Sequence, residues 1–168
     1  KVLVVFNFKN QMSIKQQLEL LEKFNQPISK QHQLIIAPII PDYNVYHFDI
    51  AVQNLSIKGR NVGDLSPQHL KHYNINYAFV GHLERQKYLN ETTRMIRSKI
   101  DNALQKDIIP IICVGNHENP IFECATYLDD LDLQDKHIIV AYERLSATLK
   151  GKKDYSFTDV EESFQDLK

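Results

Sequence analysis

The segment Tyr77-Ala78-Phe79-Val80-Gly81-His82-Leu83-Glu84-Arg85 joins four apolar residues to a Gly-His step and then to a Glu-Arg pair. A short apolar run of this kind is typical of a strand that is buried on both faces. The strand would end at a rim and carry an imidazole, a carboxylate and a guanidinium to that edge. The pattern therefore favours a catalytic site at the end of this strand.

Five further apolar runs lie on either side of this segment and alternate with helical patterns. The six runs are Val2 to Phe6, Leu34 to Pro38, Ile50 to Val52, Tyr77 to Val80, Ile108 to Val114 and Ile138 to Tyr142. Continuous apolar strands separated by helices are typical of a parallel sheet with right-handed crossovers. The sequence predicts an α/β fold of six strand-helix units, with residues 1–168 in a single domain.

Capping residues mark the expected helices. The helix starts are expected at Ser13-x-x-Gln16, Ser66-Pro67, Asn119-Pro120 and Thr158-x-x-Glu161. These pairs are typical of capping boxes or of proline in the first turn. Asn90 is expected to cap one more helix, because the apolar stripe of Ile96, Ile100 and Leu104 follows it. Little helical pattern follows the second strand.

The charge balance limits the classes of partner. Lys and Arg total 20 against 21 Asp and Glu. We therefore expect no strong attraction to nucleic acid or membranes, whereas a local cationic pocket for a small anion is compatible with this balance. No apolar run reaches the length of a membrane span.

The cysteines and histidines do not have the spacing of a metal site. Cys113 and Cys124 are the two cysteines, and the seven histidines are scattered. We expect no metal, no disulfide framework and a reducing cytoplasm as the location. The sequence also lacks a glycine-rich nucleotide motif, so we expect no cofactor.

Polar residues follow three of the expected strands, and each has an ordinary structural interpretation. Lys9 is compatible with a solvated lysine, His82 with a hydrogen-bonded structural histidine, and Glu143 with an ion pair to Arg144. Periodicity likewise leaves the sheet architecture open, because six units suit a doubly wound sheet or part of a barrel.

Four motifs together resemble the triosephosphate isomerase family. They are Gly81-His82-Leu83-Glu84-Arg85, where the family has Gly-His-Ser-Glu-Arg, together with Asn7-Phe8-Lys9, Ala141-Tyr142-Glu143 and Cys113-Val114-Gly115. The resemblance implies a TIM-barrel type of α/β fold. Six units are recognisable, and units seven and eight have no counterpart in the given sequence, so we expect an incomplete or modified barrel domain.

The resemblance also implies a reaction and the residues that carry it. The expected reaction is the cofactor-independent interconversion of dihydroxyacetone phosphate and glyceraldehyde 3-phosphate, a step of glycolysis and gluconeogenesis. Lys9 would supply positive charge, Asn7 would orient the substrate, and His82 would be a neutral electrophile. Glu143 would be the base, and this family is the standard example of such a histidine and glutamate pair. Glu84 and Cys113 are candidate supporting residues.

Two segments differ from the family pattern. The loop Gln53 to Ser66 resembles the family's dimer loop and implies a homodimer, although Val62 replaces a threonine there. The segment Arg144 to Gly151 follows the expected base and retains only Ala147 and Gly151 of the family's lid. The alternative hypothesis is therefore a non-catalytic relative that binds sugar phosphates or acts through interactions.

Overall fold

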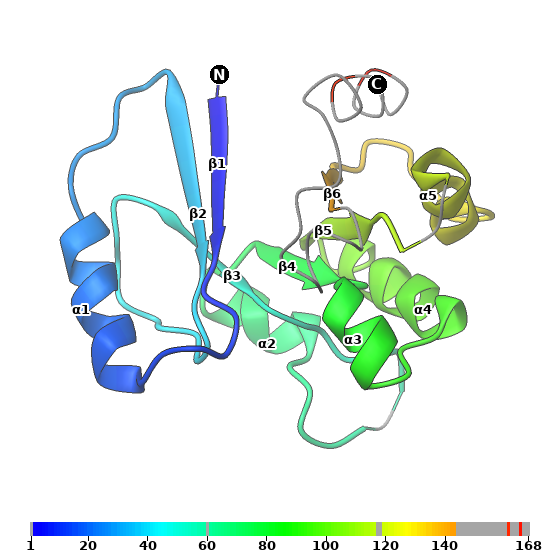
Figure 1. Cartoon of the computed structure of the whole chain (residues 1–168), viewed down its shortest axis with the longest axis horizontal. Coiled ribbons are helices and arrows are strands. Elements are labelled where there is room, and N and C mark those ends of the chain that lie inside the picture. Colours follow the sequence, from blue (N-terminus) through cyan, green and yellow to red (C-terminus); the bar gives the residue numbers. More distant parts are fainter. Residues whose placement is uncertain (1, 60, 117–118, 144–160, 162–164, 166–168) are drawn as a thin grey trace.

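Six strands form one parallel sheet in the order β1-β2-β3-β4-β5-β6. The structure is a computed structural model, and it describes residues 2–59, 61–116, 119–143, 161 and 165. The strands are β1 (Val2–Asn7), β2 (His32–Ala37), β3 (Asp49–Val52), β4 (Tyr77–Val80), β5 (Ile109–Val114) and β6 (Ile139–Tyr142). The helices are α1 (Ile14–Phe24), α2 (Pro67–His72), α3 (Leu83–Tyr88), α4 (Thr93–Leu104) and α5 (Pro120–Leu128). The sheet is curled, as expected for consecutive units of a barrel (Figure 1).

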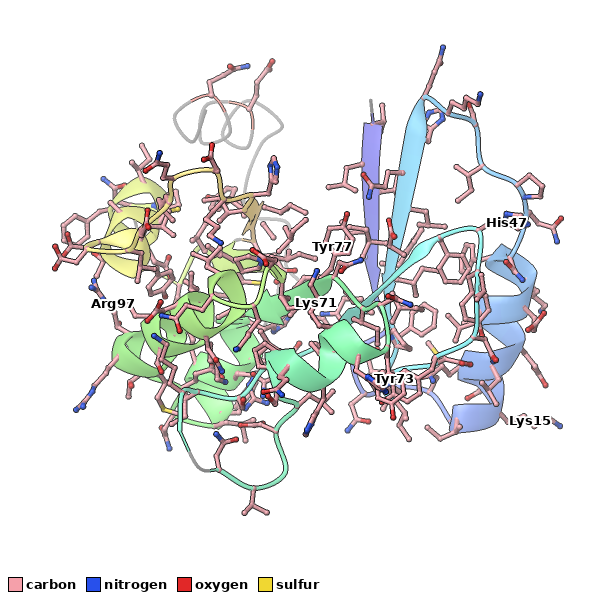
Figure 2. All side chains as sticks on the ribbon, turned by 180° about the vertical axis from the view of Figure 1, so that it is seen from behind. Lys15, His47, Lys71, Tyr73, Tyr77 and Arg97 are labelled. Carbon is pink, nitrogen blue, oxygen red and sulfur yellow. The ribbon has the colours of Figure 1, made fainter. Side chains whose placement is uncertain are left out.

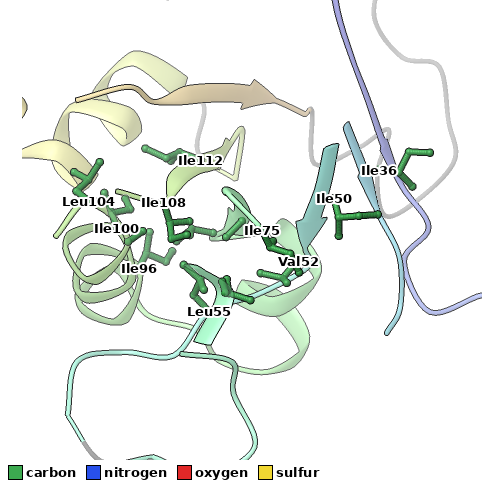
Figure 3. Packing of buried hydrophobic residues seen from close by; sticks show 14 of the residues in the cluster. Ile36, Ile50, Val52, Leu55, Ile75, Ile96, Ile100, Leu104, Ile108 and Ile112 are labelled. Carbon is green, nitrogen blue, oxygen red and sulfur yellow. The ribbon is translucent and has the colours of Figure 1, made fainter. Parts of the chain in front are cut away.

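The two faces of the sheet are both apolar, which explains the continuous apolar runs in the sequence. Side chains alternate between the faces because a strand has a period of two. The inner face carries the buried side chains of Ile35, Ala37, Ala51, Phe79, Ile111 and Cys113. The outer face packs against the helices through a larger cluster, part of which is drawn in Figure 3. The predicted α/β class is therefore confirmed.

The helix starts agree with the capping residues at three positions. Ser13 and Gln16 form the predicted capping box of α1, and prolines occupy the first turns of α2 and α5. Arg97 of α4 connects this helix to α5, because its guanidinium donates to the carbonyls of Thr126 and Asp129 (Figure 2). The predicted helix from Thr158 falls almost entirely outside the described residues.

The sequence prediction was wrong about the segment between β4 and α4. A short helix, α3, follows β4 directly, and His82 is its N-cap. Asn90 does not cap α4: it has a left-handed backbone, with φ of 53°, and the N-cap is Thr92, whose hydroxyl accepts from the N–H of Met95. The helix needs an N-cap residue with an extended backbone, and Thr92 has one whereas Asn90 does not.

Exposed apolar side chains occur on β1 and in the segment between β3 and α2. Val2 and Phe6 of β1 are 57% and 42% exposed, and Val62 is fully exposed. The segment around Val62 extends away from the sheet (Figure 1). In the described ranges, no helix has both the length and the apolar character needed to cross a membrane.

Candidate functional site

His82 lies at the carboxyl end of β4 and is 6% exposed. Its Nδ1 accepts a hydrogen bond from the backbone N–H of Glu84 at 3.2 Å. A neutral imidazole carries one proton, so this contact places the proton on Nε2. Burial lowers the pKa of His82 from its ordinary value of 6.5, and Lys9 adds to this effect, whereas Glu143, Glu84 and Glu91 oppose it. The result is a neutral N–H donor at neutral pH.

The Nε2 atom of His82 faces the carboxylate of Glu143. The distance to Oε2 is 3.8 Å, which is longer than a hydrogen bond. Within the described ranges, Nε2 has no hydrogen-bond partner. A buried donor without a partner is costly unless a ligand or water satisfies it. The arrangement therefore leaves this N–H available to a ligand oxygen.

Lys9 follows β1 at the same rim and is oriented by its neighbours. Its backbone N–H donates to Oδ1 of Asn7 at 2.9 Å, and its carbonyl accepts from Nε2 of Gln53 at 2.9 Å. Lys9 has a left-handed backbone, with φ of 50°. Its ammonium group donates to Oε1 of Glu84 at 2.8 Å. The motif around Asn7 and the motif around His82 are thus joined by an ion pair.

A cavity of about 450 Å³ opens at this rim. It is lined by Asn7, Lys9, Asn10, Ile39, Gln53, Asn54, His82, Glu84, Arg85, Tyr88 and Leu89. The sequence candidates from β1 and β4 therefore share one cavity. Its size suits a small molecule, and its polar groups include both a cation and a neutral N–H donor.

Glu143 directly follows β6 and is held against the end of β5. Its backbone N–H donates to the carbonyl of Val114 at 2.9 Å. The glutamate side chain is 35% exposed and its carboxylate faces the His82 imidazole, but Glu143 is not among the residues that line the cavity. The segment Arg144 to Gly151, which was expected to differ from the family's lid, lies outside the described residues.

Cys113 lies on the inner face of β5 and is fully buried. It pairs in register with Ala141 of β6. Burial is the main cause of a strongly raised pKa of its thiol, and the charge of Glu143 adds to it. A neutral buried thiol is a poor nucleophile, so the structure favours a packing role next to the strand of Glu143.

A buried ion-pair network behind the rim was not predicted from the sequence. Lys99 and Glu91 form an ion pair at 3.0 Å, and both side chains are 1% exposed. Nε of Arg85 donates to the same carboxylate at 2.6 Å, and Nζ of Lys99 donates to Oδ1 of Asn54 at 2.7 Å. A signal was present, because Lys99 falls within the apolar stripe of α4 next to Ile100.

Gly115 allows the close approach of Glu143 to β5. A Cβ atom on Gly115 would lie 1.8 Å from the carbonyl oxygen of Glu143, and the residue has φ of 123°. We expect Gly115→Ala to destabilise the fold through backbone strain and through a clash that adds about 1–3 kcal/mol. Gly59→Ala is the matched control, since Gly59 also has positive φ but no atom within 4 Å of the added Cβ.

Denaturant unfolding of the two glycine variants measures this difference. Gly115→Ala should unfold at lower denaturant than Gly59→Ala, with an equal slope. Equal midpoints for the two variants would show that the backbone of Glu143 is not held against Gly115.

Comparison with known proteins assigns the family. A family model described as triosephosphate isomerase matches residues 2–161. The triosephosphate isomerase of Mesomycoplasma hyorhinis is 31% identical over 176 aligned residues, which cover 90% of this chain and 72% of that relative. That of Gloeobacter violaceus is 37% identical over 102 residues, which cover 56% of this chain and 42% of that relative.

A third relative extends over most of the chain at lower identity. The triosephosphate isomerase of Clostridium botulinum strain Loch Maree is 24% identical over 172 residues, which cover 89% of this chain and 69% of that relative. The family model covers both the motif that contains His82 and the strand that precedes Glu143. The chain, with its curled sheet of six parallel strands, belongs to the triosephosphate isomerase family.

Proposed function

We propose that this chain interconverts dihydroxyacetone phosphate and glyceraldehyde 3-phosphate by proton transfer through an enediolate. The observation that carries the proposal is the position of the Nε2 atom of His82, 3.8 Å from Oε2 of Glu143 beside the cavity that Lys9 lines. A base, a neutral hydrogen-bond donor and a cation are the groups that such a reaction needs.

Each proposed role follows from the chemistry of the group. Glu143 removes a proton from the carbon next to the carbonyl and returns it to the adjacent carbon. His82 donates its Nε2 proton to the substrate oxygens, on which negative charge develops. Lys9 supplies positive charge, and Asn7 orients the substrate; the hydrogen bond from the backbone N–H of Lys9 to Oδ1 of Asn7 keeps the two residues together. Glu84 holds the ammonium group of Lys9, and Cys113 packs on β5 beside Ala141 of β6.

The lowered pKa of His82 predicts a dependence on pH. The neutral imidazole is the active donor, so kcat/KM should fall as the pH falls through the lowered pKa. Stability should also fall as the pH falls. Below pH 6.5, the ordinary pKa of histidine, the unfolded chain binds a proton on His82 that the folded chain does not yet bind. The free energy of unfolding should therefore decrease as the pH is lowered from 6.5 to the lowered pKa of His82.

An NMR titration of the His82 ring tests this prediction, with unfolding of His82→Gln measured in parallel. The variant should show a smaller loss of stability over this range than the native chain. A titration midpoint of His82 above 6.5 would contradict the prediction.

We also propose that residues 1–168 form one incomplete barrel domain that pairs into a homodimer in the cytoplasm. The loop Gln53 to Ser66 would form the interface, and the full exposure of Val62 at its tip supports this role. Sedimentation equilibrium of the chain and of Val62→Glu tests the dimer. A chain that is monomeric at all concentrations would refute it.

A non-catalytic relative that binds sugar phosphates is the second candidate. The observation that favours it is the ion pair of Lys9 with Glu84 at 2.8 Å, which compensates the positive charge at the rim. A phosphorylated substrate has to compete with this carboxylate for the ammonium group.

A coupled assay of glyceraldehyde 3-phosphate isomerisation distinguishes the two candidates. Purified chain should isomerise the substrate, and His82→Gln, prepared in the same way, should be much less active. The His82→Gln preparation also reveals contaminating host isomerase, because a contaminant would be equally active in both preparations. A folded chain without activity that still binds the substrate would favour the non-catalytic candidate.

A further inference from the structure

A set of polar side chains connects the loop after β4 to the loop after β5. The set consists of Gln86 on α3, Asn116 after β5, and Glu123 and Tyr127 on α5. None of these residues lines the cavity at the rim, yet they contact Gly81, which precedes His82, and Gly115, which lies against Glu143. We name this set the loop bridge.

Gln86 ties the loop bridge to the residue before His82. Its Nε2 donates to the carbonyl of Gly81 at 2.7 Å. A carbonyl only accepts hydrogen bonds, so the amide orientation of Gln86 is fixed, with Oε1 on the other side. Oε1 accepts from Nδ2 of Asn116 at 3.0 Å and lies 3.3 Å from the hydroxyl of Tyr127. The side chain of Gln86 therefore links the residue after β4 to the loop after β5.

Glu123 ties the loop bridge to the residues that support Glu143. Its Oε2 accepts from the N–H groups of Gly115 and Asn116, at 2.7 and 3.2 Å. Its Oε1 accepts from the hydroxyl of Tyr127 at 2.7 Å. Gly115 is the residue against which the backbone of Glu143 packs. The contacts thus run without a break from Gly81 to the backbone of Glu143.

Burial makes these contacts sensitive to the loss of a single atom. Glu123 and Tyr127 are 2% and 1% exposed. Burial raises the pKa of the Tyr127 hydroxyl, with the hydrogen bond to Glu123 as the next cause, so this group remains a neutral donor. A buried polar network with one partner removed leaves its other members unsatisfied, and the loops that it holds have to shift.

We propose that Gln86, Glu123 and Tyr127 are positioning residues that set the separation between the His82 imidazole and the Glu143 carboxylate. The proposal deepens the proposed function and rests on it for its kinetic consequence. These residues do not touch the substrate. They act by fixing the two rim segments relative to each other, and proton transfer requires a defined geometry.

The test compares Tyr127→Phe with Tyr46→Phe in the full chain. Each variant removes one hydroxyl that donates to a carboxylate, because Tyr46 donates to Oδ2 of Asp42 at 2.8 Å. Tyr46 lies between β2 and β3, away from the rim cavity. Gln86→Met is the second bridge variant, because methionine has a similar length but makes neither hydrogen bond of Gln86.

The main readout is the NMR titration of the His82 ring nitrogens, which are assigned by their absence in His82→Gln. Charges on Glu143, Lys9, Glu84 and Glu91 also act on this ring, so its titration reports the geometry around it. Both bridge variants should admit water to the rim and move the pKa of His82 back toward 6.5, whereas Tyr46→Phe should leave it unchanged. We further expect kcat to fall about tenfold in the bridge variants with little change in KM.

The result that would overturn the proposal is a native His82 titration in folded Tyr127→Phe and folded Gln86→Met. This outcome is independent of catalysis. If the native chain fails to isomerise the substrate, the proposed function is lost, and the titration still decides whether the loop bridge sets the geometry of the rim.

Discussion

Glu143→Gln is expected to lower kcat roughly 10³-fold, within the range attributed to a positioned general base. Glutamine has nearly the same size and keeps the hydrogen-bonding oxygen, but it cannot accept a proton from carbon. The substitution leaves the backbone contacts with Val114 and Gly115 intact, so the fold should be preserved. Coupled assays of the native and variant chains measure this effect.

Glu143→Asp separates the basicity of the group from its position. The shorter side chain keeps a carboxylate but retracts it by one methylene, so kcat should fall while KM changes little. The unfolding midpoint confirms that each variant is folded. Unchanged turnover in folded Glu143→Asp and Glu143→Gln would remove Glu143 from the role of base.

Lys99→Met is expected to destabilise the fold by about 3–5 kcal/mol, as found when one partner of a buried ion pair is removed. The ammonium group of Lys99 lies 3.0 Å from Oε2 of Glu91, and both side chains are almost inaccessible to water. Burial lowers the pKa of Lys99 and the charge of Glu91 opposes this shift. Without Lys99, the buried carboxylate would retain only its contact with Arg85 among those described.

Lys58→Met is the matched control for this prediction. Lys58 pairs with Asp101 at the surface, where both side chains are about one third exposed. Such a pair contributes about 0–1 kcal/mol, because water screens the charges. A difference of less than about 1 kcal/mol between the two variants in denaturant unfolding would show that the Lys99 pair is solvated or dispensable.

Much of the architecture was predictable because strands buried on both faces leave a continuous apolar signal. The four residues of β4 and the first residue of α2 were placed where the structure has them. β2 begins at His32, two residues before the predicted start, because polar residues at a strand's end add no apolar signal. α3 was missed because it has six residues and its N-cap is His82, which is not among the usual capping residues.

The individual residues of the candidate site were predictable from the sequence, but the contacts between them were not. Strand ends gave the positions of Lys9, His82 and Glu143, and the family resemblance gave their proposed roles. The ion pair between Lys9 and Glu84 joins residues 75 positions apart, and no local pattern encodes such a contact. The loop bridge was not predictable for the same reason, because Gln86 and Tyr127 are 41 positions apart in the sequence.

The most direct test of the central claim is hydrogen exchange at carbon in dihydroxyacetone phosphate. The chain is incubated with this substrate in deuterium oxide, and proton NMR follows deuterium incorporation at the carbon next to the carbonyl. If Glu143 transfers this proton, the native chain incorporates deuterium there and Glu143→Gln does not. A folded native chain that binds the substrate without exchange, or equal exchange in both proteins, would contradict the account.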